Sequence, residues 1–133
     1  YRGVLYLLPE RTVPPPELPG QLRPGAPLEL GHGLGMLRIE AGRGPGIQPA
    51  LARGGLTVRF RDGGEAIRLP AERHRRKLKK LLQDKGVLPW MRACIPLLYA
   101  GDRLIAVGDL WIAAEAYCED GYPLRWDERP LLF

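Results

Sequence analysis

Residues 56–86 read LTVRFRDGGEAIRLPAERHRRKLKKLLQDKG and contain the clearest local patterns of the 133-residue chain. Residues 56–61 alternate apolar and polar side chains, which predicts a half-buried strand. The Asp-Gly-Gly sequence at 62–64 permits the positive φ angles of a tight hairpin turn, so we predict a return strand over 65–68. Leucines spaced at i, i+3 and i+4, followed by a glycine at 86, predict a helix over 73–85 with one apolar and one cationic side.

The sequence after this stretch predicts more antiparallel sheet. Two apolar segments, 97–100 and 103–107, flank the dipeptide Gly101-Asp102, a pattern typical of a hairpin with a two-residue turn. Residues 110–113 predict a further strand, whereas the tail from 118 to 133 has a mixed composition without a clear period.

The first fifty residues are rich in proline and glycine. Short strands are predicted over 4–8, 28–30 and 36–40, separated by extended loops over 9–27 and 41–48. The predicted fold class is therefore α+β: an antiparallel β-sheet with one well-marked amphipathic basic helix, plus a Pro/Gly-rich N-terminal β segment.

The positive charge of the chain is concentrated in one segment. The net charge is +5, but residues 59–92 alone contain eleven basic and four acidic residues, a balance of +7, and the remainder is at −2. A localised cationic surface favours a polyanion, because each phosphate that it neutralises releases condensed counterions. A solvated helix face without a partner is the alternative that charge alone leaves open.

Other classes of function find little support in the residues. Cys94 and Cys118 lie in no CxxC or Cys/His cluster, so we expect no metal site and a reducing, cytoplasmic compartment. No apolar run approaches the roughly 20 residues that span a bilayer, so no membrane partner is expected. Asp62 and Glu65 do not form a catalytic pair in this interpretation: Asp62 shapes the turn and Glu65 pairs with an arginine. We expect no catalytic residue.

The order and spacing of several short motifs across about residues 55–114 resemble the C-terminal domain of tRNA(Ile)-lysidine synthetases. The family patterns are R-x-G-G-E, LK-K-L, P-W-x-R and P-L. The matching segments are RDGGE at 61–65, KLKKLL at 77–82, VLPWMR at 87–92, PLLY at 96–99 and LIAVG at 104–108. One departure is Leu88, where the family often has a second proline.

The resemblance implies a parent enzyme that uses ATP to activate C2 of the wobble cytidine in the CAU anticodon of tRNA(Ile), where lysine then replaces AMP. The family's phosphate loop, S-G-G-x-D-S, does not occur in this sequence. We therefore expect no cofactor in this chain and place ATP, with magnesium, in a separate N-terminal catalytic domain. The resemblance gives the C-terminal region the role of holding tRNA away from the anticodon, including its acceptor stem.

The resemblance and the helical pattern together give a set of candidate residues. The motif Gly63, Gly64, Glu65 and Pro89 is expected to be structural, and Trp90 is either a core residue or a platform for nucleotide stacking. The candidate tRNA contacts are Arg61, Arg73, Arg76, Lys77, Lys79, Lys80 and Arg92.

The resemblance also suggests how the chain is divided. Residues 1–50 are expected to be a linker and small C-terminal subdomain, and residues 51–133 the substrate-binding domain. The expected partners are tRNA(Ile) and the catalytic domain of the same enzyme, and a homo-oligomer is left open. The competing hypothesis is an interdomain packing module that makes no direct contact with RNA.

Overall fold

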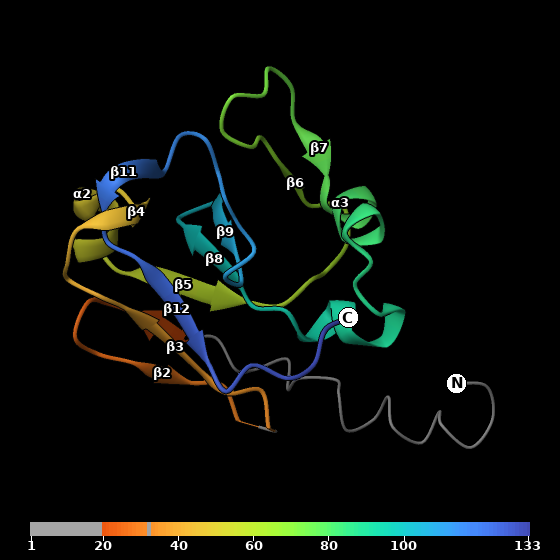
Figure 1. Cartoon of the computed structure of the whole chain (residues 1–133), viewed down its shortest axis with the longest axis horizontal. Coiled ribbons are helices and arrows are strands. Elements are labelled where there is room, and N and C mark those ends of the chain that lie inside the picture. Colours follow the sequence, from red (N-terminus) through yellow and green to blue (C-terminus); the bar gives the residue numbers. More distant parts are fainter. Residues whose placement is uncertain (1–19, 32) are drawn as a thin grey trace.

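The computed structural model describes residues 20–31 and 33–133, and the predicted strand over 4–8 lies outside them. Its largest sheet is antiparallel, with five strands in the order β1-β5-β8-β9-β10 (Figure 1). The pattern of residues 56–61 and the hairpin around Gly101-Asp102 were sufficient to predict three of these strands. Their bounds are β1 Gly20–Leu22, β5 Leu56–Arg59, β8 Leu97–Ala100, β9 Arg103–Val107 and β10 Trp111–Ile112.

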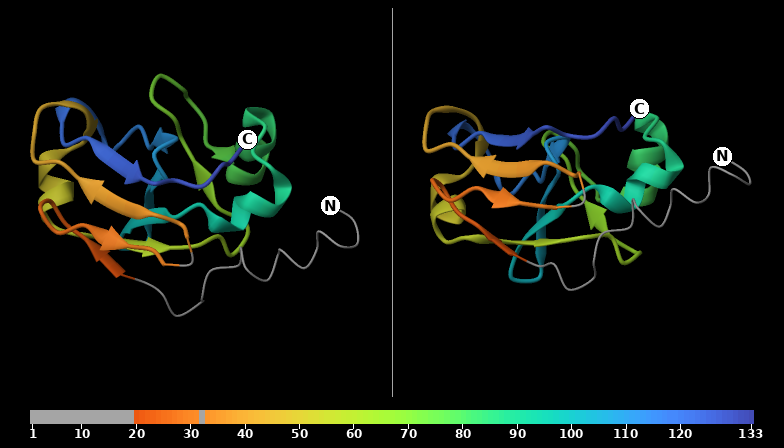
Figure 2. Two further views of the ribbon diagram at one scale, coloured as in Figure 1. Left: turned by 60° about the horizontal axis from the view of Figure 1, so that its bottom comes forward. Right: turned by 90° about the horizontal axis from the view of Figure 1, so that it is seen from below.

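Two smaller antiparallel sheets join the first half of the chain to its last strands. One has the order β12-β3-β2, and the other pairs β11 with β4. Figure 2 shows these strands lying over the large sheet. The inward side chains of all three sheets share one hydrophobic core. The bounds are β2 Leu28–Glu29, β3 Met36–Ile39, β4 Gly44–Ile47, β11 Tyr117–Gly121 and β12 Leu124–Asp127.

A projecting hairpin and a helix complete the fold. Strands β6 (Ala66–Ile67) and β7 (Arg76–Lys77) pair with each other, and the segment between them extends beyond the sheets at the top of Figure 1. We call residues 66–77 the arm. Helix α3 (Leu78–Lys85) follows directly and buries Leu78, Leu81 and Leu82 in the core. The other helical elements among the described residues are α2 (Pro49–Arg53) and the 3-10 helix η2 (Pro89–Cys94).

The predicted helix over 73–85 is wrong at its beginning. Residues 76–77 form a strand because they pair with residues 66–67, and the amide of Leu78 donates to the carbonyl of Glu65 at 2.9 Å. Helix α3 therefore starts five residues later than predicted. Its end is as predicted, since Gly86 takes a left-handed conformation with φ 83°.

The predicted hairpin across 62–64 is also wrong. Strand β5 pairs with β1 and β8, and β6 pairs only with β7, so residues 62–64 connect two different sheets. Residues 44–47 form strand β4 where a loop was predicted, and strands β11 and β12 occupy the tail that showed no pattern. Strand β1 lies within the loop predicted over 9–27.

In coarse terms the fold class is confirmed, because the chain consists mostly of antiparallel strands with few helices.

Strand pairing crosses the boundary predicted at position 50, since β1, β3 and β4 all pair with later strands. The assignment of separate roles to 1–50 and 51–133 stays a prediction. In the described part of the chain, no helix has the length and apolar character needed to cross a bilayer.

Candidate nucleic-acid interface

The arm and the first turn of helix α3 carry four exposed cationic side chains that form no ion pair with any described residue. Arg73 and Arg75 lie in the segment between β6 and β7, Lys77 ends β7, and Lys79 lies on the outer side of α3. All four are exposed. We call them the arm cations. Their side chains are free to meet phosphates without first breaking an internal ion pair.

Two other candidate contacts, Arg76 on the arm and Lys80 on α3, are engaged in ion pairs. The guanidinium of Arg76 lies 3.6 Å from the carboxylate of Glu72 and donates to that of Asp84 at 3.1 Å. The ammonium of Lys80 lies 3.6 Å from the same Asp84 carboxylate. These pairs are partly exposed, so each stabilises the fold only weakly. The pair of Arg76 with Asp84 connects the arm to α3, whereas the pair of Lys80 with Asp84 lies within the helix.

Arg61 and Glu65 organise the loop that precedes the arm. The Glu65 carboxylate accepts hydrogen bonds from the amides of Asp62 at 2.7 Å and Gly63 at 3.1 Å. Arg61 Nε lies 3.8 Å from the same carboxylate, and the Arg61 side chain is only 20% exposed. Gly63 and Gly64 both have positive φ, at 107° and 80°, which allows the loop to turn. This arrangement explains the RDGGE motif by loop geometry and places Arg61 further from solvent than the arm cations.

The P-W-x-R motif lies on the other side of α3 from the tip of the arm (Figures 1 and 2). Pro89 is the first residue of η2, where its missing amide hydrogen costs no bond. Arg92 Nε donates to the carbonyl of Val87 at 3.1 Å and is half-buried. Trp90 is half-buried and packs against the core. The structure therefore does not bring Trp90 and Arg92 together with the arm cations.

The fold adds two arginines that the sequence patterns did not select. Arg59 on β5 stacks over the ring of Tyr99 on β8, with its guanidinium carbon 4.8 Å from the ring centre. Arg103 begins β9 and is exposed. A small concavity of about 190 Å³ lies between the arm and the β8–β9 hairpin. It is lined by Glu65, Ala66, Arg75, Tyr99, Asp102, Arg103 and Leu104. No sequence period could have shown this convergence, because it depends on strand pairing over long separations.

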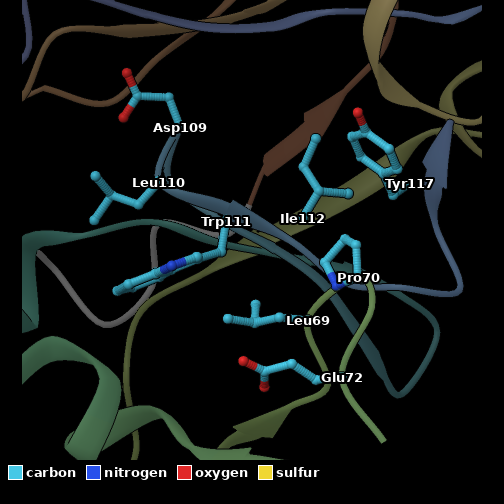
Figure 3. A pocket seen from close by; sticks show the side chains of 8 residues that line it. All are labelled: Leu69, Pro70, Glu72, Asp109, Leu110, Trp111, Ile112 and Tyr117. Atoms are coloured by element: carbon cyan, nitrogen blue, oxygen red, sulfur yellow. The ribbon is translucent and has the colours of Figure 1, made fainter. Parts of the chain in front are cut away.

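An apolar groove lies at the base of the arm (Figure 3). It has a volume of about 410 Å³ and is lined by Leu69, Pro70, Glu72, Asp109, Leu110, Trp111, Ile112 and Tyr117. Both carboxylates are paired with arginines, Glu72 with Arg76 at 3.6 Å and Asp109 with Arg129 at 2.8 Å. The groove thus presents an apolar wall with a neutralised rim.

A cluster of charged side chains on β3 and β12 has a structural role. Arg38 donates to Asp127 and to Glu40, at 2.8 Å and 2.7 Å. These hydrogen bonds from Arg38 hold the pKa of both carboxyl groups below their ordinary values and raise the pKa of Arg38. The cluster lies across paired strands and satisfies its own charges.

Comparison with known proteins identifies similarities over most of the chain. The profile of a family described as "TilS substrate C-terminal domain" matches residues 56–126. A curated "tRNA(Ile)-lysidine synthase" of Nitrosomonas europaea is 33% identical over 122 residues, which cover 91% of this chain and 27% of the relative. The protein of the same name from Yersinia pseudotuberculosis is 35% identical over 106 residues, 77% of this chain and 23% of the relative. The Xylella fastidiosa protein of that name is 52% identical over 59 residues, 44% and 14% of the two chains.

One solved structure, titled "Crystal structure of TILS C-terminal domain", aligns with a TM-score of 0.63 and 21% identity. The alignment covers 82% of this chain and 98% of the other, so the two share a fold. The chain spans about a quarter of the length of the first two curated relatives.

Proposed function

Because this chain belongs to the TilS substrate C-terminal domain family, we propose that it is the tRNA-binding accessory region of a tRNA(Ile)-lysidine synthase. In this proposal the parent enzyme is an ATP-dependent ligase that joins lysine to C2 of the wobble cytidine in the CAU anticodon of tRNA(Ile). The names of the curated relatives support this identity of the parent enzyme. The catalytic domain, with ATP and magnesium, would lie in a separate N-terminal part, and the enzyme would work in the cytoplasm.

The observation that carries the proposal is the set of arm cations. These four exposed cations, without ion pairs among the described residues, lie on a projecting hairpin and the first turn of the adjoining helix. The contacts would be made to phosphates, and they would hold the body or acceptor stem of the tRNA by charge and shape. Arg76 and Lys80 would support this surface through their pairs with Asp84.

The test is a titration of the chain with a tRNA(Ile) transcript over a series of salt concentrations. The variant Arg73→Gln/Lys77→Gln/Lys79→Gln removes three arm cations but leaves Arg76 and Lys80 in place. Each lost phosphate contact lowers the slope of log K against log salt by about 0.9, so we expect a decrease of up to about 2.7.

The control is a triple variant with the same change of charge, Arg43→Gln/Arg53→Gln/Arg125→Gln, away from the arm. It should bind tRNA like the parent sequence. If both triple variants lost the same amount of tRNA affinity, net charge rather than the arm would be the cause of binding. A parallel titration with elongator tRNA(Met) measures whether this region discriminates between tRNAs.

The apolar groove favours a second candidate function, an interdomain packing module. A groove with half-buried aromatic side chains in its wall and a neutralised rim suits an apolar protein segment better than a phosphate. This hypothesis predicts tight binding of the chain to the separately produced N-terminal part of a parent enzyme, and no binding to isolated tRNA. Competition between tRNA and that part distinguishes the two functions.

A further inference from the structure

We propose that the concavity between the arm and the β8–β9 hairpin holds one backbone phosphate of the bound RNA, with Arg75 on one wall and Arg103 on the other. We call it the arginine cleft. The inference rests on the proposed tRNA-binding function and deepens it. It adds a contact between the RNA and the β8–β9 hairpin to the contacts that the arm cations would make.

The walls of the arginine cleft come from segments that are far apart in sequence. Arg75 belongs to the arm, whereas Arg103 and Tyr99 belong to the β8–β9 hairpin. The volume of about 190 Å³ is well below the roughly 300–1,000 Å³ of sites for drug-sized ligands. A space of this size suits a small anionic group such as a phosphate.

The charges in the cleft favour an anion. Neither Arg75 nor Arg103 forms an ion pair with a described residue, and both are exposed. Of the two carboxylates on the walls, that of Glu65 is already engaged by the loop amides and lies 3.8 Å from Arg61 Nε. Asp102 is the one remaining carboxylate of the lining, and two lining arginines outnumber it. Two guanidinium groups facing one space can bind a phosphate from two sides.

Tyr99 adds a neutral donor to this arrangement. Burial is the main cause that raises the pKa of its phenol, so the hydroxyl keeps its proton at neutral pH and can donate. The guanidinium of Arg59, stacked on the Tyr99 ring, adds positive charge beside the cleft. A bound phosphate would join the arm to the large sheet, because its partners lie on both.

The test is a double-mutant cycle with Arg75→Gln, Arg103→Gln and the double variant, measured as tRNA(Ile) affinity over a salt series. Each single change should weaken binding roughly tenfold and lower the salt slope by about 0.9, as expected for loss of a charged phosphate contact. If both arginines hold the same phosphate, the double variant should bind nearly as well as either single one. Arg103→Lys should recover part of the affinity, because it keeps the charge and loses only the forked geometry.

Arg43→Gln is the matched control, an exposed arginine outside the cleft, and should leave both quantities unchanged. Unfolding midpoints in urea establish that each variant is folded. Unchanged affinity and slope in Arg103→Gln would overturn the arginine cleft, as would strictly additive losses in the double variant. In either case, a loss of tRNA affinity on neutralising Arg73, Lys77 and Lys79 would still support the proposed function. Absence of tRNA binding by the unmodified chain would overturn both.

Discussion

Replacement of Glu65 by alanine should destabilise the fold by about 3 kcal/mol. Its carboxylate accepts hydrogen bonds from two backbone amides, those of Asp62 and Gly63. A hydrogen bond to a charged group contributes about 1.5–3 kcal/mol, and the lower value applies here because both amides lie in a loop that water can reach. Two bonds at about 1.5 kcal/mol each give about 3 kcal/mol.

The same replacement should leave Arg61 without its counter-charge. The Arg61 Nε atom is buried and makes no hydrogen bond within the described part of the chain, and its guanidinium lies beside Glu65. Removing one partner of a partly buried pair costs more than removing both, because the remaining charge keeps its desolvation penalty. The double variant Glu65→Ala/Arg61→Met should therefore be more stable than Glu65→Ala alone.

Urea unfolding followed by circular dichroism measures both effects as differences in the free energy of unfolding. Glu65→Gln is the matched intermediate, since both amides donate to the same carboxylate oxygen and an amide oxygen in its place can accept both hydrogen bonds without the negative charge. Hydrogen bonds to a neutral acceptor are roughly half as strong, so this variant should lose about half as much stability as Glu65→Ala. A loss below about 1 kcal/mol in Glu65→Ala would show that the loop does not depend on this carboxylate. A double variant less stable than the single one would refute the assigned role of Arg61.

Three further predictions concern other parts of the fold. Leu82→Ala should lower the free energy of unfolding by about 2–5 kcal/mol in urea, because the side chain is fully buried between α3 and the core. Gly46→Ala should abolish the β4–β11 pairing or the cooperative transition itself, since a Cβ atom there would lie 2.2 Å from the carbonyl oxygen of Tyr122; an unchanged melting curve would contradict this. Arg38→Met should reduce stability at pH 7 and have a diminishing effect below about pH 4, because Arg38 lowers the pKa of Asp127 and that contribution is lost as the carboxylate protonates. Unfolding at pH 7 and at pH 3 measures the difference.

The sequence predicted those parts of the fold in which local pattern and tertiary packing agree. Residues 56–59 alternate and form a strand, and the leucines of α3 are buried at the expected spacing. The helix start was wrong because the run from Arg73 to Lys77 is compatible with either structure, and only pairing with β6 selects a strand. Strand β4 was missed because Gly44-Pro45-Gly46 has the composition of a loop.

In the candidate site too, local sequence pattern could not show which side chains are paired in the folded structure. The local density of positive charge predicted Lys77 and Lys79 as contacts. The structure leaves both side chains exposed and without ion pairs among the residues it describes. The same density could not distinguish them from Arg76, whose guanidinium is held by two carboxylates. Arg103 lies outside the basic segment, and it approaches Arg75 only through the pairing of distant strands.

The pairing of β3 with β12 also determines when the chain can fold. Met36 lies opposite Asp127, and Ile39 opposite Leu124, so this sheet closes a loop of more than eighty residues. A ribosome must therefore release nearly the whole domain before the early strand acquires its partner. Contacts of such long sequence separation slow folding, towards milliseconds to seconds for a largely β topology. The arm, by contrast, pairs residues about ten positions apart, so its two strands can meet as soon as that short segment has been synthesised.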